Sequence, residues 1–382
     1  MKNFTFYNPT KIQFGEGSIS SLAKLIPHDA TVLFAYGGGS IKSNGVYDQV
    51  TEQLNNVKVV EFGGIEANPE FSTLMKAVAA AKDAGVDFIL AVGGGSVVDG
   101  AKFIAAAMHH DDDPWSILNG ARVSKATPLG CILTLPATGS ESNTSAVVNR
   151  QEMNQKKAFS SPHVQPTFAI LDPTVTYSLP ERQLINGVVD PFVHVIEQYL
   201  TYPVNATVQD RFAEGILMNL IDIGKDAINS QDYALRANLM WNATQALNGL
   251  IGVGVPQDWS THMIGHELTA AYGLDHAVTL AIVLPRLMQQ QRNTKRDKLL
   301  QYAQRVWQID VSEPESAIDE VINKTEQFFH SLGMKTRLSD YGIGEEAIDT
   351  VQQGLVSNGY LQLGEQRDIT PQVAGAIIKA SL

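Results

Sequence analysis

The stretch "DFILAVGGGSVVDGAKFIAAA", residues 87–107, decides the fold class of the N-terminal half of this chain. A short apolar run ends at three glycines, and a segment with helical periodicity follows at once. The same order begins earlier at "TVLFAY" (31–36), which ends at Gly37, and at "VKVVEF" (57–62), which ends at Gly63. Strand, glycine turn and helix in alternation indicate parallel strands covered by helices. We therefore predict an α/β, Rossmann-like N-terminal domain.

Beyond about residue 180 the sequence changes from β-branched alternation to helix-length periodicity. Pro173 and Pro180 separate the two textures, because proline discourages helix continuation. The long amphipathic segments of the second half are residues 210–228, 232–251 and 295–307. We predict an α/β domain at residues 1–180 and an all-helical domain at residues 181–382, with a cleft between them.

The composition is that of a folded globular protein, with 44% hydrophobic and 18% charged residues among 382. The chain has 40 acidic and 28 basic residues without long blocks of one sign, and its net charge of -12 argues against nucleic acid or an anionic membrane as a partner. The one cysteine, Cys131, lies in an apolar run, which predicts a buried strand thiol and excludes a disulfide within the chain. No run of about 18 apolar residues occurs and the N-terminus lacks a hydrophobic h-region, so we expect a cytoplasmic protein.

The glycines at 93–95 suit a phosphate, because residues without a side chain let an anion reach the backbone N–H groups. The following helix would direct its N-terminal amides and its dipole at the same point. The turn is not the common G-x-G-x-x-G fingerprint, since Val98 stands where the last glycine belongs. A plain tight turn between strand and helix is the alternative. Asp99 is either an acid favoured by the helix dipole or a hydrogen-bond acceptor for a ligand.

The earlier turn, Gly37-Gly38-Gly39-Ser40, bears on which dinucleotide would bind. NAD-specific sites commonly place an acid at a strand end to accept the ribose hydroxyls. Here no acid occurs before Asp48, whereas Ser40, Lys42 and Ser43 are present. This turn would therefore tolerate a 2′-phosphate.

Asp190 and His194 are spaced so that a helix would place both on one face. Pro191 suits the first turn of a helix, so we predict that Asp190 lies at or next to the N-cap. A plain cap followed by a packed helix histidine is the alternative. His262 and His266 repeat the same spacing.

His276 needs a break in the helix to reach the other histidines, because a continuous helix would separate it from His262 by about 21 Å. Gly273 predicts that break, since a C-cap glycine would end the helix and let the chain turn back. Three imidazoles and one carboxylate form a set suited to Zn²⁺ or Fe²⁺. Spacing does not decide between His262 and His266 as the ligand, and a spare imidazole would suit proton transfer. Glu267 is expected to face solvent or another helix.

Taken together, these motifs resemble the iron-containing (group III) alcohol dehydrogenases, and most closely their branch of NADPH-dependent aldehyde reductases and butanol dehydrogenases. The resemblance covers nearly the whole chain and is carried by "FTFYNPTKIQFGEGS" (4–18), "GGGSVVDGAKFIA" (93–105), "LPATGSESN" (135–143), "AILDP" (169–173), "DPFVHVIEQY" (190–199) and "HMIGHELTAAYGLDHAVTLAIVLP" (262–285). It implies a Rossmann-like dinucleotide-binding domain followed by a helical domain that binds metal and substrate. It also implies reduction of short-chain aldehydes to primary alcohols, and the reverse oxidation, with NADP(H) and one divalent ion, Zn²⁺ or Fe²⁺.

The resemblance also implies roles for individual residues. The metal ligands would be Asp190, His194, His262 and His276, and His266 would stay unligated near the nicotinamide as the catalytic histidine. NAD-using members carry an aspartate after the second strand, where this chain has glycines, so NADP is favoured. The cofactor contacts that the resemblance implies are Gly37, Gly38, Gly39, Ser40, Gly93, Gly94, Gly95, Ser96, Asp99, Thr134, Thr138 and Lys156.

Other functions stay open at this point. A polyol or glycerol dehydrogenase, or an enzyme like dehydroquinate synthase, belongs to the same superfamily and would need polar groups facing the substrate. A metallohydrolase would use the histidines to activate water, and a non-catalytic nucleotide-binding protein would use them structurally. We expect small aldehydes and alcohols as partners, together with a second copy of the chain in a homodimer, which an exposed N-terminal strand such as "FTFYN" (4–8) would suit.

Overall fold

The computed structural model describes residues 1–382, which divide into two units by their contacts. The α/β unit comprises Tyr7–Pro180 and Gln231–Thr244. The helical unit comprises Met1–Phe6, Glu181–Ser230 and Gln245–Leu382. The predicted domain boundary after residue 180 is one of the positions at which the chain passes from one unit to the other.

A six-stranded sheet forms the centre of the α/β unit, with the strand order β1-β8-β5-β4-β2-β3 and parallel pairing throughout. Its strands are β1 (Lys11–Phe14), β2 (Thr31–Tyr36), β3 (Lys58–Phe62), β4 (Phe88–Gly94), β5 (Leu129–Leu135) and β8 (Phe168–Leu171). β2, β4 and β5 are buried along nearly their whole length, as parallel strands covered on both faces must be. The predicted α/β fold is confirmed, and so is the buried thiol of Cys131 on β5.

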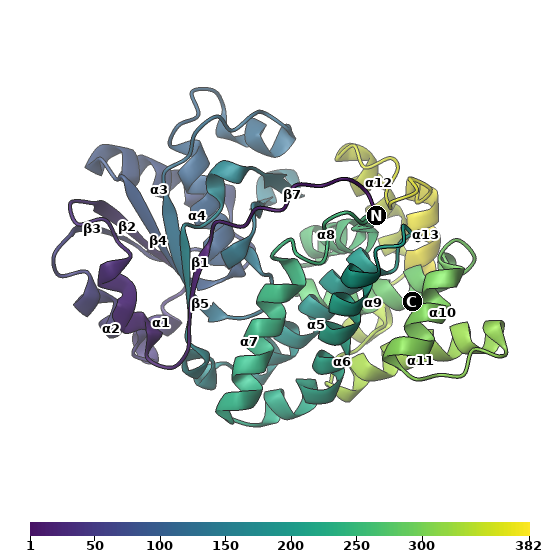
Figure 1. Cartoon of the computed structure of the whole chain (residues 1–382). Helices are drawn as coiled ribbons and strands as arrows, with labels where there is room; N and C mark the ends of the chain where they lie inside the picture. Colours follow the sequence, from purple (N-terminus) through teal and green to yellow (C-terminus); the bar gives the residue numbers. More distant parts are fainter. The chain divides into compact units, whose positions relative to one another are not determined.

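Helices cover both faces of this sheet (Figure 1). They are α1 (Ser40–Ser43), α2 (Val46–Gln53), α3 (Phe71–Ala84) and α4 (Gly95–Ala107). Apolar residues of α2 share a core cluster with Phe34 and Leu90, whereas those of α3 and α4 share another with Leu33 and Ile89. Because successive residues of a strand face opposite sides, the two clusters lie on opposite faces of the sheet.

The strand order brings both predicted phosphate turns to the same place. β3 lies on one side of β2, and the chain then returns to place β4 on the other side. In open α/β sheets, ligands bind at such a reversal point, outside the carboxyl ends of the strands. Gly37 follows β2 and Gly93 belongs to the end of β4, so the two glycine turns are neighbours at the reversal point.

The predicted N-terminal strand at residues 4–8 is wrong. Residues 1–10 contain no strand, and the sheet ends instead at β1. The side chain of Asn8 donates a hydrogen bond of 3.0 Å to the backbone oxygen of Ser142, and Pro9 has no N–H with which to continue a ladder. The remaining strands of the α/β unit, β6 (Ser145–Arg150) and β7 (Gln155–Ser160), form an antiparallel hairpin.

The helical unit contains no strands and consists of helices with their connections. These are α5 (Glu181–Tyr199), α6 (Thr207–Asn229), α8 (Ser260–Tyr272), α9 (His276–Gln290), α10 (Arg296–Val306), α11 (Pro314–Ser331), α12 (Glu346–Ser357) and α13 (Pro371–Ala380). α5 packs against α6 and α9, and α8 packs against α9 and α12. The predicted helical character of the C-terminal half is confirmed. One further helix, α7 (Tyr233–Leu247), begins in the α/β unit and ends in the helical unit.

α5 differs from its prediction at Pro191. The helix begins at Glu181 and Pro191 lies inside it, so the predicted position of Asp190 at the N-cap is wrong. An interior proline costs about 3 kcal/mol, which packing must offset. The helix continues because it is buried on all sides from Gly187 to Tyr199, where apolar residues such as Val188, Phe192 and Ile196 pack into the core. Asp190 and His194 still share one face of α5, as their spacing predicts.

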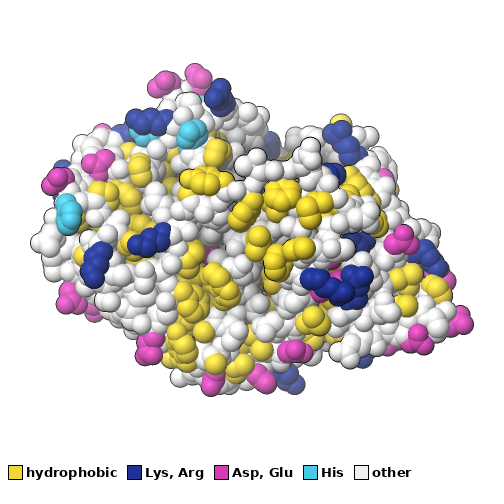
Figure 2. All heavy atoms as spheres, viewed as in Figure 1, with side chains coloured by type: hydrophobic (Ala, Val, Ile, Leu, Met, Phe, Trp, Pro, Cys, Tyr) yellow, Lys and Arg dark blue, Asp and Glu magenta, His cyan; other side chains and the backbone are white.

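Charged side chains of both signs are mixed on the face shown in Figure 2, where the basic ones form small separate groups. That face offers no extended basic surface of the kind that binds nucleic acid. None of the helices combines the length and the apolar character that crossing a membrane requires.

Candidate active site

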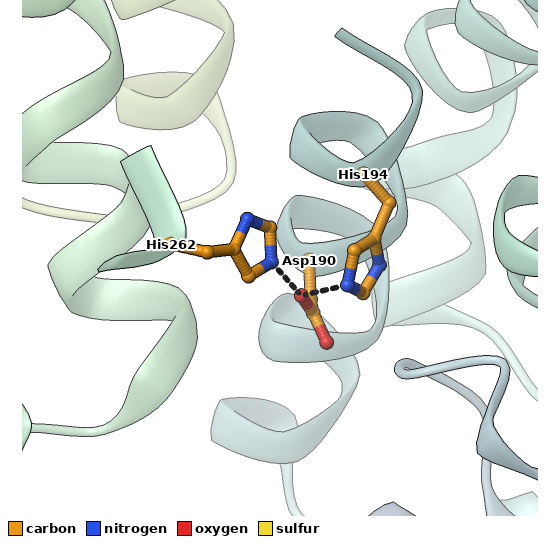
Figure 3. A group of neighbouring side chains, drawn as sticks. All are labelled: Asp190, His194 and His262. Atoms are coloured by element: carbon orange, nitrogen blue, oxygen red, sulfur yellow. Dashed lines mark ion pairs between the residues drawn. The ribbon is translucent and has the colours of Figure 1, made fainter. Parts of the chain in front are cut away.

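Two helices of the helical unit bring three predicted metal ligands together (Figure 3). Asp190 and His194 come from α5, and His262 comes from α8. The Nε2 atoms of His194 and His262 lie 3.4 and 3.7 Å from the same oxygen of Asp190, Oδ1. All three side chains are buried.

His276 joins this cluster from α9. α8 ends at Gly273, whose φ of 68° is left-handed, and α9 begins at His276. The turn brings His276 Nε2 to 3.8 Å from Asp190 Oδ1, with 24% of the His276 side chain exposed. The predicted helix break at Gly273 is confirmed, and it places a histidine that a continuous helix would hold far from the cluster.

The arrangement of Asp190, His194 and His262 fits a divalent metal ion, with His276 Nε2 next to the same carboxylate oxygen. Atoms bonded to one such ion at about 2.0–2.2 Å lie roughly 3 to 3.5 Å apart. The distances from Asp190 Oδ1 to the three imidazole nitrogens, 3.4 to 3.8 Å, lie at or slightly above the upper end of this range and are too long for good hydrogen bonds. Asp190 Oδ1 and His262 Nε2 are buried without a hydrogen-bond partner, and an ion between them would satisfy both.

Burial and charge shift the pKa values in this cluster. Burial lowers the pKa of His194 to about 4, which keeps its imidazole neutral and able to bind a metal. Burial also lowers the pKa of His262, but the charges of Glu197 and Asp190 outweigh it and raise that pKa to about 9. Burial raises the pKa of Asp190, whereas the neighbouring histidines lower it by more, so Asp190 is ionised.

His266 lies on α8 beside the four converging atoms. Its side chain is buried, and its ring centre is 5.3 Å from that of His276 and 6.4 Å from that of His262. The next residue, Glu267, accepts a hydrogen bond of 2.9 Å from Asn358, which directly follows α12. Of the two predicted environments of Glu267, solvent or another helix, the structure confirms the second, because Glu267 contacts the end of α12.

A cavity of about 580 Å³ in the helical unit adjoins the elements that carry this cluster. Asn186, one helical turn before Asp190, lines it, and so does Asp275, which directly precedes His276. Its apolar walls are formed by Ile185, Leu274, Val278 and Met334. Charged and polar residues also line it, namely Glu181, Arg182 and Tyr341, and Arg182 lies 3.3 Å from Asp275 in an ion pair.

The glycines where β4 passes directly into α4 are closely packed. A side chain on Gly93 would come within 2.5 Å of Val97, and one on Gly95 would overlap Thr138. Only glycine fits at these positions, so the turn presents backbone groups rather than side chains. Thr134 lies near the end of β5, the strand that pairs with β4, so the predicted threonines belong to the same end of the sheet.

Asn68 connects two predicted cofactor residues and was not apparent from the sequence. Its backbone N–H donates to Ser96 Oγ at 3.3 Å, and its side-chain oxygen accepts from Lys156 Nζ at 2.8 Å. Its φ of 60° is left-handed, which asparagine tolerates better than most residues. The following Pro69 was the only signal in the sequence, and it indicates a turn rather than a site.

Asp99 is held by donors of the protein itself. Ser140 Oγ donates to Asp99 Oδ1 at 2.5 Å, and the N–H of Val147 donates to Oδ2 at 3.0 Å. Lys102 Nζ donates to Ser140 Oγ at 2.9 Å and to the backbone oxygen of Ser145 at 2.7 Å. Burial lowers the pKa of Lys102 to about 8 and raises that of Asp99. This network fixes the segment after β5 onto α4.

The turn after β2 is open by comparison. A β-carbon placed on Gly38 or Gly39 would have nothing within 4 Å, although the φ of 98° at Gly39 is left-handed and suits glycine. Beside this turn, Lys42 Nζ lies 3.1 Å from Glu61 Oε1, and hydrogen bonds with Tyr36 and Glu61 raise the pKa of Lys42. Glu61 belongs to β3, so the sequence pattern around the turn did not reveal it.

Known families match both units. Residues 9–173 match the family described as iron-containing alcohol dehydrogenase, and residues 184–382 match the C-terminal region of the Fe-containing alcohol dehydrogenase family. The chain belongs to the iron-containing alcohol dehydrogenase family. The resemblance inferred from the sequence motifs is confirmed.

Individual alcohol dehydrogenases of this kind match over their full length. The NADPH-dependent aldehyde reductase YqhD of Escherichia coli (strain K12) is 56% identical over 386 residues, covering 100% of both chains. The NADH-dependent butanol dehydrogenase B of Clostridium acetobutylicum is 39% identical and covers 100% of both chains. The crystal structure of NADH-dependent butanol dehydrogenase A from Thermotoga maritima is 35% identical, with a TM-score of 0.96 over 100% of this chain and 99% of that chain. Membership in an alcohol dehydrogenase family does not favour a metallohydrolase or a non-catalytic nucleotide-binding protein.

Proposed function

We propose that this protein reduces short-chain aldehydes to primary alcohols with NADPH and a bound metal ion, and catalyses the reverse oxidation. The observation that carries the proposal is the convergence of three imidazole nitrogens on Asp190 Oδ1, at 3.4 to 3.8 Å, in a member of the iron-containing alcohol dehydrogenase family. The 56% identity to an NADPH-dependent aldehyde reductase supports the reaction and its substrate class.

The proposed metal ligands are Asp190, His194, His262 and His276. Their nitrogen and carboxylate donors suit either Zn²⁺ or Fe²⁺. When bound, such an ion supplies Lewis acidity toward the oxygen of the aldehyde or alcohol. The chain's own contribution is to hold the ligand atoms in place and to bury most of them, since electrostatic interactions are stronger where water is excluded.

The relatives differ in the cofactor, because one is named for NADPH and another for NADH. A preference for NADPH is supported by the turn after β2, where Gly37, Gly38 and Gly39 carry no acid and the nearby Glu61 is paired with Lys42. The backbone N–H groups of residues 93–96, with the positive end of α4, would hold the pyrophosphate. The further contacts that we propose for the cofactor, which supplies the hydride, are Ser40, Asp99, Thr134, Thr138 and Lys156.

His266 is the proposed source of the proton that converts the alkoxide to the alcohol, either directly or through water or a ribose hydroxyl. Its ring lies beside that of the proposed ligand His276, with centres 5.3 Å apart. Imidazole exchanges protons near neutral pH, which suits it to this role.

The cavity beside the cluster is the proposed place for the carbon chain of the substrate. Its apolar walls of Ile185, Leu274, Val278 and Met334 suit short aliphatic or simple aromatic aldehydes. Asn186 and Asp275 offer polar groups that a polyol dehydrogenase would use, so glyceraldehyde is the informative competitor.

The test is a cofactor oxidation assay. Protein loaded with Zn²⁺ or Fe²⁺ is mixed with butanal and either NADPH or NADH, and loss of the reduced cofactor is followed. Faster loss of NADPH is expected, with glyceraldehyde a poorer substrate than butanal. No oxidation of either cofactor by the loaded protein would overturn the proposed reaction, and faster loss of NADH would overturn the cofactor preference.

A homodimer and a location in the cytoplasm are also part of this proposal. β1 is an edge strand of the sheet, and Phe4, Phe6 and Tyr7 are exposed near it in sequence, which supports pairing with a second copy. The single cysteine, Cys131, is a buried thiol without a disulfide, which suits a reducing compartment. The mass in solution by light scattering tests the dimer.

A further inference from the structure

A buried carboxylate lies directly behind one of the proposed metal ligands. Glu197 is on α5, and only 3% of it is exposed. Its Oε2 pairs with Nδ1 of His262 on α8, on the side of the ring away from Asp190. Its other oxygen, Oε1, accepts the backbone N–H of Thr261 at 2.6 Å. Both oxygens of Glu197 are therefore directed at the start of α8.

The start of α8 favours an ionised Glu197 that accepts hydrogen bonds. A backbone N–H can only donate, so the bond from Thr261 fixes Oε1 as an acceptor. Trp259, at the N-cap of α8, has a left-handed φ of 65° and provides no side-chain cap. Glu197 thus satisfies an amide that the helix leaves open, and the positive end of the helix dipole stabilises its negative charge.

An accepting carboxylate at Nδ1 determines which nitrogen of His262 has a free lone pair. A histidine that binds a metal must be neutral, and neutral imidazole carries its proton on one nitrogen only. When Nδ1–H donates to Glu197, the lone pair is left on Nε2, the atom that lies 3.7 Å from Asp190 Oδ1 and has no hydrogen-bond partner. The opposite tautomer would place a lone pair against the carboxylate and a proton where a metal ion would bind.

We infer that Glu197 is a positioning residue for the metal, which fixes the ring orientation and the tautomer of His262. The inference rests on the proposed function, because it assumes that His262 is a ligand. A carboxylate that accepts from the second nitrogen of a ligating histidine orients the ring and makes it a stronger ligand. Glu197 does not touch the ion or the substrate, so it acts only through His262.

The segment that presents His262 is held rigidly by further buried charges. The N–H of Asp258 donates to the backbone oxygen of Glu197 at 2.9 Å, and Asp258 Oδ1 accepts the N–H of Ser260 at 3.0 Å. Lys295 Nζ lies 2.7 Å from Asp258 Oδ2 and 2.8 Å from Glu365 Oε2, and all three side chains are almost fully buried. Because these bonds fix the start of α8 independently, Glu197 can be changed without releasing the helix.

The test replaces Glu197 by glutamine in the full-length protein. Glutamine has the same shape but one acceptor oxygen, so it cannot accept from both Thr261 and His262. The matched control is Glu214→Gln, which alters a buried carboxylate on α6 that accepts from Tyr199 at 2.9 Å and from Arg211 at 2.7 Å, away from the metal ligands. Each protein is stripped of metal, and its affinity for Zn²⁺ is measured by competition with a chelating indicator.

Glu197→Gln is expected to weaken Zn²⁺ binding by about 10- to 100-fold, whereas Glu214→Gln changes it by less than about threefold. The visible d–d absorption of the Co²⁺-loaded protein is a second readout, because it responds to the ligand field and not to overall stability. It should change in Glu197→Gln and stay the same in Glu214→Gln. If the Zn²⁺ affinity and the Co²⁺ spectrum are unchanged in Glu197→Gln, Glu197 only caps α8 and the inference is overturned.

A second variant, Glu197→Asp, covers the case in which glutamine prevents folding. It keeps the charge but shortens the side chain by one methylene, so the carboxylate can no longer reach both partners. Weaker Zn²⁺ binding than in wild type supports the inference, and equal binding overturns it. If the wild-type protein itself binds neither Zn²⁺ nor Co²⁺, the proposed function fails together with this inference, whereas wild-type binding with unaltered Glu197 variants defeats the inference alone.

Discussion

The two candidate sites are built in opposite ways. In the helical unit, histidines from α5, α8 and α9 converge on Asp190 Oδ1, and the proposed site is made of side-chain atoms. In the α/β unit, the turns after β2 and β4 consist of glycine, and they present backbone to whatever binds there. The first site depends on which side chains are present, and the second depends on which are absent.

This difference predicts two patterns of response to substitution. Removing one ligand atom from the helical unit should abolish metal binding at once, because the remaining donors no longer complete the set. Changes in the glycine turns should have effects graded by volume and charge, because backbone contacts survive until a new side chain displaces them.

His276→Ala should lose most of its metal and lower kcat/KM by roughly 10³-fold, because the Lewis acid contributes several kcal/mol to stabilising charge on oxygen. His266→Ala should keep its metal and lower kcat by about 10²-fold, as expected for loss of a proton donor. Metal analysis and steady-state kinetics distinguish the two variants. Equal metal loss in both would contradict the separate roles proposed for these neighbouring rings.

Gly95→Ala should destabilise the α/β unit by about 1–3 kcal/mol, because the new methyl group would overlap Thr138. Binding of NADPH should weaken in parallel, since the turn must move to make room. Urea unfolding and fluorescence titration with NADPH measure the two effects. The stability control is Gly38→Ala, whose methyl group meets nothing within 4 Å and should cost less than Gly95→Ala. Similar losses of stability in both variants would show that packing does not distinguish the two turns.

The stability of the α/β unit should rise with pH through Lys102. Burial lowers its pKa to about 8 from the ordinary 10.5, so between these pH values the folded chain releases a proton that the unfolded chain keeps. The free energy of unfolding therefore increases with pH in that window, by at most about 1.4 kcal/mol per pH unit. The measurement is the difference in unfolding free energy between wild type and Lys102→Met from pH 7 to pH 10. A difference that stays constant or falls would contradict the assigned sign.

Gly38→Asp should reduce the preference for NADPH over NADH by about tenfold, because an added carboxylate repels the 2′-phosphate. The fold should be unaffected, since nothing lies within 4 Å of a side chain at this position. The ratio of kcat/KM for the two cofactors measures the effect, with Gly38→Asn as the uncharged control. If both variants change the ratio equally, shape rather than charge controls the choice of cofactor.

Local patterns in the sequence predicted what neighbouring residues can decide. The strand, glycine and helix order at residues 87–107 predicted the parallel sheet, because each of its signals lies within one turn of the next. The spacing of Asp190 and His194 and the helix break at Gly273 were likewise local, and both are present. The meeting of His262 with Asp190 is a contact between helices, and periodicity alone left His262 and His266 as alternatives.

The features that the sequence did not predict depend on distant residues. In the sequence, nothing distinguishes Glu197 from other helix residues, and its role depends on its contact with His262 of α8. Asn68 has only the pattern of a turn residue, and its role depends on its contacts with Ser96 and Lys156. Pro191 was expected at the beginning of a helix because proline favours the first helical turn. In α5 the burial of the helix from Gly187 to Tyr199 outweighs that preference.

The passage of α7 through both units bears on the order in which the chain is made. Residues 231–244 belong to the α/β unit, where Met240 enters the core and Thr244 donates a 2.6 Å hydrogen bond to the fully buried Glu141. A ribosome that has delivered residues 1–180 has made every strand of the sheet but not this helix. Until α5, α6 and α7 have also been synthesised, the nascent α/β unit lacks Met240 in its core, and the Glu141 carboxylate lacks its donor Thr244.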